Sequence, residues 1–475
     1  MQRLTVFGLM LLAVLPAAHA DEKDWVAYAQ PVIAITHASI VDGTGGAPKL
    51  DQTLVIDKGR ISELGPAAST TVPTGATVID AHGKTLLPGF VMMHEHLFYT
   101  THPGKPPFFY GTAMPRTFPP LYLAGGETFI RTTGTVMPYT DLNVRDNIAA
   151  GKRIGPDIDV TGPYLNGPNP LTEEIHVLSG PADATRTVNY WADEGVTSFK
   201  AYQHITRAEL KAAIDAAHAH HIKITAHLCS VTYREAANMG IDNLEHGFFQ
   251  ASDFASDKQP DICPDDLQKS FVALNPDSPE VTSLIKLLVT RHVAITSTLA
   301  IFETFVPGRP KTPQPALDLL NPELRATYET YWAKVQAEPQ ARAQAQQKLF
   351  ATAARLEKRF ADAGGLLMGG SDPTGYGGVI PGFSSKRQIE LLVQVDGFTF
   401  PQALEIMSLN AARYEGRARD IGSLAVGKRA DIVVIDGDPM KDVTAVVHMP
   451  LVFKDGVGYD TAAIFKSMQS AVGMN

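Results

Sequence analysis

Two histidines, His94 and His96, stand two positions apart at the end of an apolar run that begins at Gly89. In a β-strand, residues i and i+2 face the same side, so both imidazoles would point one way and Glu95 the other. Two imidazoles on one face of a strand suit a divalent metal ion. Such pairs also arise by chance, so further ligands are needed to predict a site.

Three more ligand-type residues follow short apolar runs. His227 ends KITAH, His246 ends NLEH and Asp372 ends MGGSD. If these runs are neighbouring parallel strands, their carboxyl ends meet on one face of the fold. The joint pattern therefore predicts a metal centre built from four histidines and one aspartate.

Lys200 ends the run VTSFK in an apolar neighbourhood. A buried ammonium beside metal ions is unfavourable, whereas a desolvated neutral lysine can add carbon dioxide and become an anionic carbamate. The alternative is a surface lysine that begins a loop. The residues alone slightly favour this alternative.

The elements that must position these residues lie between 88 and 415. Short apolar runs alternate there with amphipathic helical stretches, a pattern typical of βα units around a parallel sheet. The count predicts an α/β protein with a (β/α)8 TIM-type barrel. Thr206 to Glu209 and Thr399 to Gln402 predict helix starts. The eight candidate strands are 89–96, 133–140, 157–164, 196–202, 223–229, 243–248, 292–300 and 364–372.

The flanking regions have a different pattern. Residues 21–87 and 416–475 contain alternating runs separated by Gly- and Asp-rich turns, which predict hairpins. We expect both chain ends to build one small β-sandwich domain beside the barrel of 88–415. Three insertions, 98–122, 250–280 and 302–350, follow candidate strands and would lie on the face where barrel sites form.

Residues 1–20 have the pattern of a signal peptide. Arg3 precedes an apolar run from Leu4 to Leu15, and Ala18-His19-Ala20 matches a cleavage site. We therefore expect an exported protein, periplasmic or secreted. Cys229 and Cys263 could be oxidised there, but sequence spacing says nothing about their distance, and two unpaired thiols are the favoured reading.

Composition narrows the possible partners. Hydrophobic residues make up 44% of the 475, and the formal net charge is −9. The hydrophobic content is high enough for a large buried core. An acidic chain without a basic block is a poor nucleic-acid binder. After signal removal we expect no membrane association, a small-molecule substrate and a homo-oligomer.

Three motifs carry a resemblance to the amidohydrolase superfamily. TLLPGFVMMHEH is similar to its opening motif, DNLEHG to its "S-I-E-H-G" motif, and LNAARYEG with DIGSLAVGKRADIVVIDGDP to its C-terminal signature. The chain most closely resembles the binuclear, carboxylated-lysine subgroup, in particular prolidase-like and imidazolonepropionase-related amidohydrolases. The resemblance covers nearly the whole chain after residue 20.

The resemblance implies two divalent ions, which we expect to be zinc, and carbon dioxide bound as a carbamate on Lys200. His94 and His96 would hold one ion with Asp372, His227 and His246 the other, and Lys200 would bridge. A bridging hydroxide would attack the scissile carbonyl, while Asp372 would pass its proton to the leaving amine.

The sequence also departs from the family pattern. Met92 replaces a usual aspartate, strand five ends His227-Leu228-Cys229, and the turn after strand four is Ala201-Tyr202-Gln203. These departures leave the ligand set intact and the substrate class open.

Substrate contacts are predicted from loop positions. His176 roughly matches a family histidine that reaches the scissile group. Tyr202, Tyr233 and Arg234 are candidates for binding a substrate carboxylate. For each, an ordinary exposed or packing residue is the alternative.

The function predicted is hydrolysis of an amide bond in a dipeptide or N-acyl amino acid. An ester, lactone or carbamate hydrolase could use the same site, because hydroxide attacks each carbonyl alike. A deaminase fits less well because that branch usually lacks the bridging lysine. A non-catalytic scaffold would be expected to have lost ligands, and none is missing here.

Overall fold

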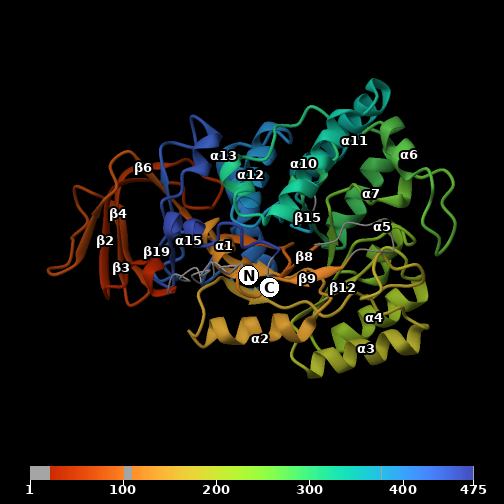
Figure 1. The fold of residues 1–475 in the computed structure, drawn as a ribbon, viewed down its shortest axis with the longest axis horizontal. Coiled ribbons are helices and arrows are strands. Elements are labelled where there is room, and N and C mark those ends of the chain that lie inside the picture. Colours follow the sequence, from red (N-terminus) through yellow and green to blue (C-terminus); the bar gives the residue numbers. More distant parts are fainter. Residues whose placement is uncertain (1–21, 101–109, 376, 474–475) are drawn as a thin grey trace, which may run out of the picture.

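The computed structural model describes residues 22–100, 110–375 and 377–473, which form a mixed α/β fold (Figure 1). Its centre contains eight short parallel strands in two sheets, ordered β11-β10-β7 and β12-β13-β14-β15-β16. The strands are β7 (Phe90–Met92), β10 (Glu127–Arg131), β11 (Asp157–Asp159), β12 (Ser198–Ala201), β13 (Lys223–Ala226), β14 (Asn243–Glu245), β15 (Ala294–Ser297) and β16 (Leu367–Gly369).

Main-chain hydrogen bonds connect the edges of these two sheets. Near β11 and β12, the Gly162 amide donates to the Ser198 carbonyl at 2.9 Å. Near β16 and β7, the Met93 amide donates to the Gly369 carbonyl at 2.8 Å. The carboxyl ends of all eight strands therefore open toward one side.

Seven of the eight candidate strands contain a strand of this set, and one prediction was wrong. Residues 133–140 form a turn and the start of α2 (Pro138–Ala149), while the strand lies earlier, at β10. Pro138 at the first helical position favours a helix start. The charged ends of β10, Glu127 and Arg131, hid it because they break the apolar pattern expected of a buried strand.

Helices follow the strands along the chain. Both predicted helix starts are confirmed, at α4 (Arg207–Ala219) and α13 (Phe400–Met407). The other helices of this layer are α3 (Pro181–Asp193), α5 (Tyr233–Met239), α7 (Pro279–Thr290), α12 (Ser384–Gln394) and α14 (Leu409–Tyr414).

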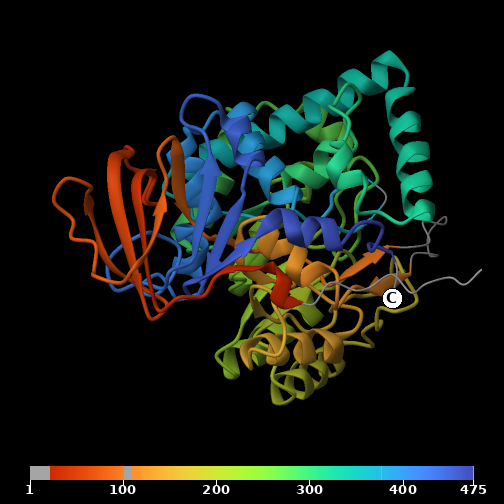
Figure 2. The same ribbon diagram turned by 60° about the vertical axis from the view of Figure 1, so that its left-hand side comes forward.

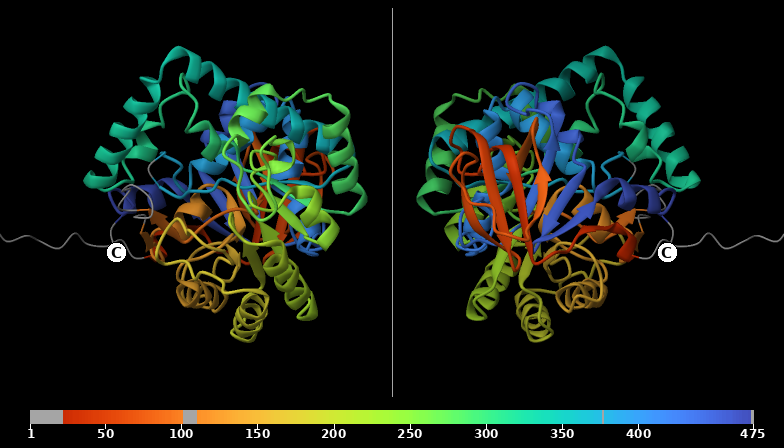
Figure 3. Two further views of the ribbon diagram at one scale, coloured as in Figure 1. Left: turned by 90° about the vertical axis from the view of Figure 1, so that its right-hand side faces the viewer. Right: turned by 90° about the vertical axis from the view of Figure 1, so that its left-hand side faces the viewer.

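The three insertions carry their own elements. Region 98–122, of which 101–109 lie outside the described residues, contains β8 (Phe98–Thr100), β9 (Gly111–Ala113) and the start of α1 (Phe118–Ala124). Region 250–280 contains η2 (Ser252–Phe254) and α6 (Leu267–Ala273). Region 302–350 is helical, as predicted, and α10 and α11 project from the body (Figure 3). Its helices are α8 (Leu299–Glu303), α9 (Gln314–Leu317), α10 (Pro322–Gln336) and α11 (Gln340–Asp362).

Strands from both chain ends form one nine-stranded sheet, ordered β1-β19-β18-β17-β6-β2-β3-β4, with β5 paired to β2 (Figure 2). It buries a separate apolar cluster that includes Ile33, Leu54, Ile432 and Phe453. These strands pair as one sheet, which contains strands from both chain ends. The elements are η1 (Glu22–Trp25), β1 (Val26–Tyr28), β2 (Val32–Ile40), β3 (Lys49–Asp57), β4 (Arg60–Pro66), β5 (Thr77–Asp80), β6 (Lys84–Pro88), β17 (Ile432–Asp436), η3 (Val443–Val447), β18 (Leu451–Lys454), β19 (Val457–Asp460) and α15 (Thr461–Ser467).

Cys229 and Cys263 form a disulfide, with Cα atoms 4.8 Å apart. The reading of two unpaired thiols was therefore wrong, because the fold returns region 250–280 to the end of β13. The bridge ties this insertion to the turn that follows His227.

The signal-peptide prediction concerns residues 1–20, which lie outside the described residues. Within the described ranges, no helix is both long and apolar enough to cross a membrane.

We predict that the oxidised protein, unfolded in denaturant without reductant, shows no free thiol toward a thiol reagent. Reduction should expose both cysteines. The double variant Cys229→Ser/Cys263→Ser should lose about 2–4 kcal/mol of stability, because a cross-link restricts the unfolded chain. Denaturant melts of the two proteins measure the difference, and equal midpoints would contradict the prediction.

Candidate metal centre

The predicted ligands converge at the carboxyl ends of five strands. His94 and His96 follow β7, Lys200 lies within β12, and the other three follow β13, β14 and β16. All six side chains are buried, with exposed fractions of 9% or less. The six are His94, His96, Lys200, His227, His246 and Asp372.

Asp372 stands against three of the histidines. Its Oδ1 lies 3.1 Å from His96 Nε2 and 3.6 Å from His94 Nε2, and its Oδ2 lies 3.8 Å from His246 Nδ1. One ligand atom each from His94, His96 and Asp372 lies within 4.8 Å of the others. This spacing can hold a metal ion.

Lys200 belongs to the same cluster, and the surface-lysine alternative is wrong. Its side chain is 1% exposed, and its Nζ lies 3.2 Å from His94 Nε2 and donates to the Thr133 carbonyl at 3.1 Å. Burial lowers the pKa of Lys200 to about 8, while Glu245 and Asp372 act in the opposite direction. A neutral amine, the form that can add carbon dioxide, is therefore accessible near neutral pH.

The remaining two histidines lie side by side, with ring centroids 4.4 Å apart. Thr298 Oγ1 lies 2.8 Å from His246 Nδ1, whereas His246 Nε2 is buried with no hydrogen-bond partner among the described residues. Gln203 Nε2 lies 3.1 Å from His227 Nε2. A buried nitrogen without a partner is costly, and a metal ion would satisfy it.

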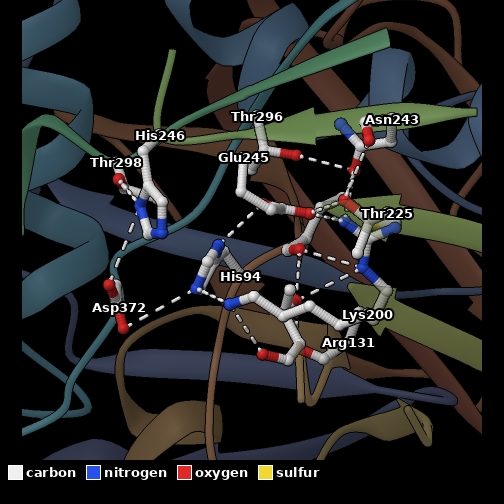
Figure 4. A network of polar contacts seen from close by, with 12 residues as sticks. His94, Arg131, Lys200, Thr225, Asn243, Glu245, His246, Thr296, Thr298 and Asp372 are labelled. Atoms are coloured by element: carbon white, nitrogen blue, oxygen red, sulfur yellow. Dashed lines mark hydrogen bonds and ion pairs between the residues drawn. The ribbon is translucent and has the colours of Figure 1, made fainter. Parts of the chain in front are cut away.

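A buried polar network orients the first histidine (Figure 4). Glu245 Oε2 lies 2.6 Å from His94 Nδ1, and Glu245 Oε1 accepts from Arg131 at 2.8 Å and from Thr225. Arg131 also donates to Asn243 at 2.6 Å. A carboxylate on Nδ1 leaves Nε2 of His94 with a lone pair for a metal.

His96 is oriented in the same way by a main-chain group. Its Nδ1 lies 3.1 Å from the Gly134 carbonyl, which leaves Nε2 facing Asp372. Glu95, between the two histidines, points away from them and accepts from the Ser371 amide and hydroxyl at 2.8 and 2.6 Å. The predicted alternation along this segment is confirmed.

The protonation states suit metal binding. Burial, followed by the charge of Lys200, holds the pKa of His94 and of His227 well below its usual range. Burial and the neighbouring His227 do the same for His246. Burial alone would raise the pKa of Asp372, but His94, His96 and Lys200 lower it to about 2. Near neutral pH the imidazoles are thus neutral and the carboxylate ionised.

Two ligands have a left-handed backbone, with φ of 67° at His246 and 56° at Asp372. Non-glycine residues rarely adopt this conformation, and they do so mainly where function or surrounding structure requires it.

A cavity of about 170 Å³ opens onto these ligands. Phe98, Val136 and Ile175 supply apolar wall, and Tyr164 and Tyr202 add two phenols. The Glu174 carboxylate also lines it and accepts from the Gly111 amide at 2.7 Å. The cavity therefore suits a small ligand with an apolar part.

Of the four predicted substrate contacts, only Tyr202 lines this cavity. The side chain of His176 is 53% exposed, and its Nε2 lies 3.0 Å from Asp183. Tyr233 is fully buried, and its hydroxyl lies 3.1 Å from the carbonyls of Glu245 and Gly247. Arg234 is exposed on α5, near Ser283.

The structure therefore places His176, Tyr233 and Arg234 outside the lining of this cavity. Successive residues of a helix point in different directions, so following a barrel strand in sequence does not aim a side chain at its mouth. Sequence reasoning missed Glu245, Tyr164 and Glu174. Glu245 lies within the DNLEHG motif, directly before His246, whereas the other two lie in loops without a local signal.

A family model described as the amidohydrolase family matches residues 339–470. An imidazolonepropionase from Deinococcus deserti is 37% identical over 86 residues, which is 18% of this chain and 21% of that protein. A dihydroorotase from Caldanaerobacter subterraneus is 34% identical over 112 residues, 24% of this chain and 23% of that protein. The matches thus span about a fifth of these curated relatives.

Solved structures show the same fold over most of the chain. A Xaa-Pro dipeptidase with bound methionine has a TM-score of 0.66 at 17% identity and covers 90% of this chain and 100% of that chain. A bottromycin amidohydrolase has a TM-score of 0.69 at 17% identity and covers 94% and 91%. Residues 339–470 therefore match the amidohydrolase family, and most of the chain has the fold of these solved structures.

Proposed function

We propose that this protein is a metal-dependent hydrolase of carbon–nitrogen bonds that cleaves amides. One observation carries the proposal: six buried ligand-type side chains gather at the strand ends, and five of them line one cavity. His246 Nε2 is buried there without a partner among the described residues. A non-catalytic scaffold would have no reason to retain the full set.

The residues fit two divalent ions, and we assign zinc because four imidazoles and a carboxylate suit it. His94, His96 and Asp372 would hold one ion. His227 and His246 would hold the other, and Lys200 as a carbamate would bridge. The lowered pKa of Lys200 and its contact with His94 support the bridging role.

When bound, the two ions would lower the pKa of a water molecule and polarise the substrate carbonyl. The chain supplies the proton transfer. Asp372, ionised near neutral pH, has two oxygens, so one can bind metal while the other accepts the proton of the attacking water. The same oxygen then returns this proton to the leaving amine. Phe98, Val136 and Ile175 would restrict the access of bulk water.

For the substrate we propose a dipeptide or an N-acyl amino acid. The cavity has room for a small ligand, and solved structures of this fold include a prolidase complexed with N-methylphosphonate-L-proline. An ester, lactone or carbamate offers the same kind of carbonyl, so these compounds form the comparison set in the assay.

We also propose that the eight parallel strands close as a (β/α)8 barrel beside a β-sandwich of both chain ends. The hydrogen bonds at both edges of the two parallel sheets support closure.

Export after removal of residues 1–20 is a further part of the proposal. The Cys229–Cys263 disulfide supports it, since disulfides persist mainly in oxidising compartments. The intact mass of protein recovered outside the cytoplasm should match a chain that begins at Asp21. A mass that retains Met1 to Ala20 would reject cleavage at this site.

The function is tested by metal analysis together with a hydrolysis screen of dipeptides, N-acyl amino acids, esters and lactones. We expect two ions per chain and turnover of at least one amide class. Lys200→Ala should lose metal and more than about a hundredfold in kcat, because even supporting groups of a metal site contribute 10–100-fold. Short-chain carboxylates should restore part of the activity by replacing the bridge.

Lys211→Ala is the matched control, because Lys211 is half-exposed on α4 and pairs with Asp215. It should keep metal and activity. A Lys200→Ala protein with full metal content and normal turnover would contradict the bridging role, and a metal-free wild-type protein would contradict the proposed function.

We predict that Asp372→Asn, fully loaded with metal, loses at least about a hundredfold in kcat. The amide keeps the size and one oxygen ligand but cannot accept the proton, and such acid–base help is typically worth about 10²–10⁴-fold. Steady-state kinetics on the best substrate measure the loss. His176→Asn serves as the control and should remain near wild type, since His176 lies outside the cavity. Normal turnover by Asp372→Asn would mean that another residue accepts the proton.

A further inference from the structure

A second cavity, of about 210 Å³, lies between α8, the first turns of α12 and the end of η3. Its wall includes Glu303, Ser384, Lys386 and Val447, and it shares no lining residue with the cavity at the metal centre. The segment 377–379, which follows the Asp372 turn, forms part of its wall.

The Lys386 ammonium lines this cavity and has no carboxylate partner in the part of the chain that the structure describes. The residue is 3% exposed, and among the described residues its Nζ contacts the Val447 carbonyl at 3.4 Å and the Phe383 and Phe465 rings at 5.1 Å. Burial lowers the pKa of Lys386 to about 8. A buried ammonium with so weak a set of contacts is costly unless an anion joins it.

Two further donors face the same space. Ser384 is 4% exposed, and its hydroxyl has no hydrogen-bond partner among the described residues. Arg309 donates to the Gly377 carbonyl at 3.0 Å, while its Nε is buried and likewise without a partner in that part of the chain. Buried polar groups of this kind normally have partners.

The carboxylates of the wall are already engaged. Glu303 receives two hydrogen bonds from Arg387, at 2.6 and 2.9 Å, and Glu390 receives one at 2.6 Å. Lys311, at the exposed end of the cavity, pairs with Glu329 at 2.6 Å. Among the described residues, the positive charge of Lys386 and that of Arg309 therefore have no paired carboxylate.

The backbone adds to this preference for an anion. Ser384 and Lys386 lie in the first turn of α12, an 11-residue helix whose N-cap, Phe383, provides no side-chain cap. The first N–H groups of a helix point out of its end and favour negative charge there.

The rest of the wall decides what kind of anion fits. Pro310, Pro313, Val379 and Phe383 make much of the surface apolar. A strongly hydrated phosphate ion would make no favourable contact with the apolar wall. A short organic acid would place its carboxylate at the positive groups and its hydrocarbon part against the apolar wall.

We propose that this cavity is a binding site for a small organic carboxylate with an apolar body, distinct from the metal centre. Its carboxylate meets Lys386, Ser384 and Arg309, and its apolar part lies against Val379 and Phe383. The site does not depend on the function proposed for the metal centre.

The test is calorimetric titration of the metal-loaded protein with butyrate, with butyramide of matched shape and with inorganic phosphate. Butyrate should bind, and butyramide and phosphate should bind at least about tenfold more weakly. Lys386→Met should weaken butyrate binding at least about tenfold while metal content and hydrolysis stay normal. Lys441→Met, which removes a side chain that is 84% exposed, is the matched control and should bind like wild type.

Ser384→Ala is a second variant that removes a single hydroxyl and keeps the proposal testable if Lys386→Met fails to fold. It should also weaken butyrate binding. Butyrate binding that is unchanged in both variants would place the ligand at the metal ions and overturn the proposal. Equal binding of butyramide would overturn it too, and preferential binding of phosphate would overturn the assignment to an organic acid.

Discussion

A carboxylate removed from water must be paired, and Glu245 satisfies this requirement with groups from several strands. It contacts His94 after β7, Arg131 on β10 and Thr225 on β13, while Glu245 itself ends β14. Arg131 is 1% exposed, so neither charge could remain without the other. The ion pair therefore fixes the spacing of four strand ends, and this spacing sets the position of the first metal-ligand histidine.

The need of buried ionisable groups for partners from other strands explains which parts of the structure could be predicted from the sequence. The ligands were predictable because each closes an apolar run, and His94, Lys200 and Asp372 do lie within reach of one another. Strand β10 was not predictable, because its two end residues, Glu127 and Arg131, are ionisable residue types that are buried here. Such residue types usually indicate a surface segment. A pattern of apolar residues cannot report a partner that arrives from another strand.

Other differences between the sequence predictions and the structure have different physical causes. The pairing of Cys229 with Cys263 depends on the path of a 34-residue segment, which spacing does not reveal. Tyr233 and Arg234 follow a ligand strand, yet one enters the core and the other faces solvent, because a helix turns each successive residue by about 100°. The sequence pattern also did not predict the close approach of β16 to β7. A Cβ at Gly370 would lie 2.3 Å from His94 Cβ, so glycine is needed there for the two ligand strands to meet.

The sheet built from both chain ends has a consequence for biosynthesis. Lys84 on β6 pairs with Asp436 on β17, 352 positions later, and β1 pairs with β19 (Figure 2). The amino-terminal strands therefore have an unpaired edge until the last part of the chain has been made. Contacts this distant in sequence form slowly, because a long loop must close before they stabilise anything. A nascent chain would stay incompletely folded through most of its synthesis, which is the state that a translocation channel for unfolded polypeptides requires.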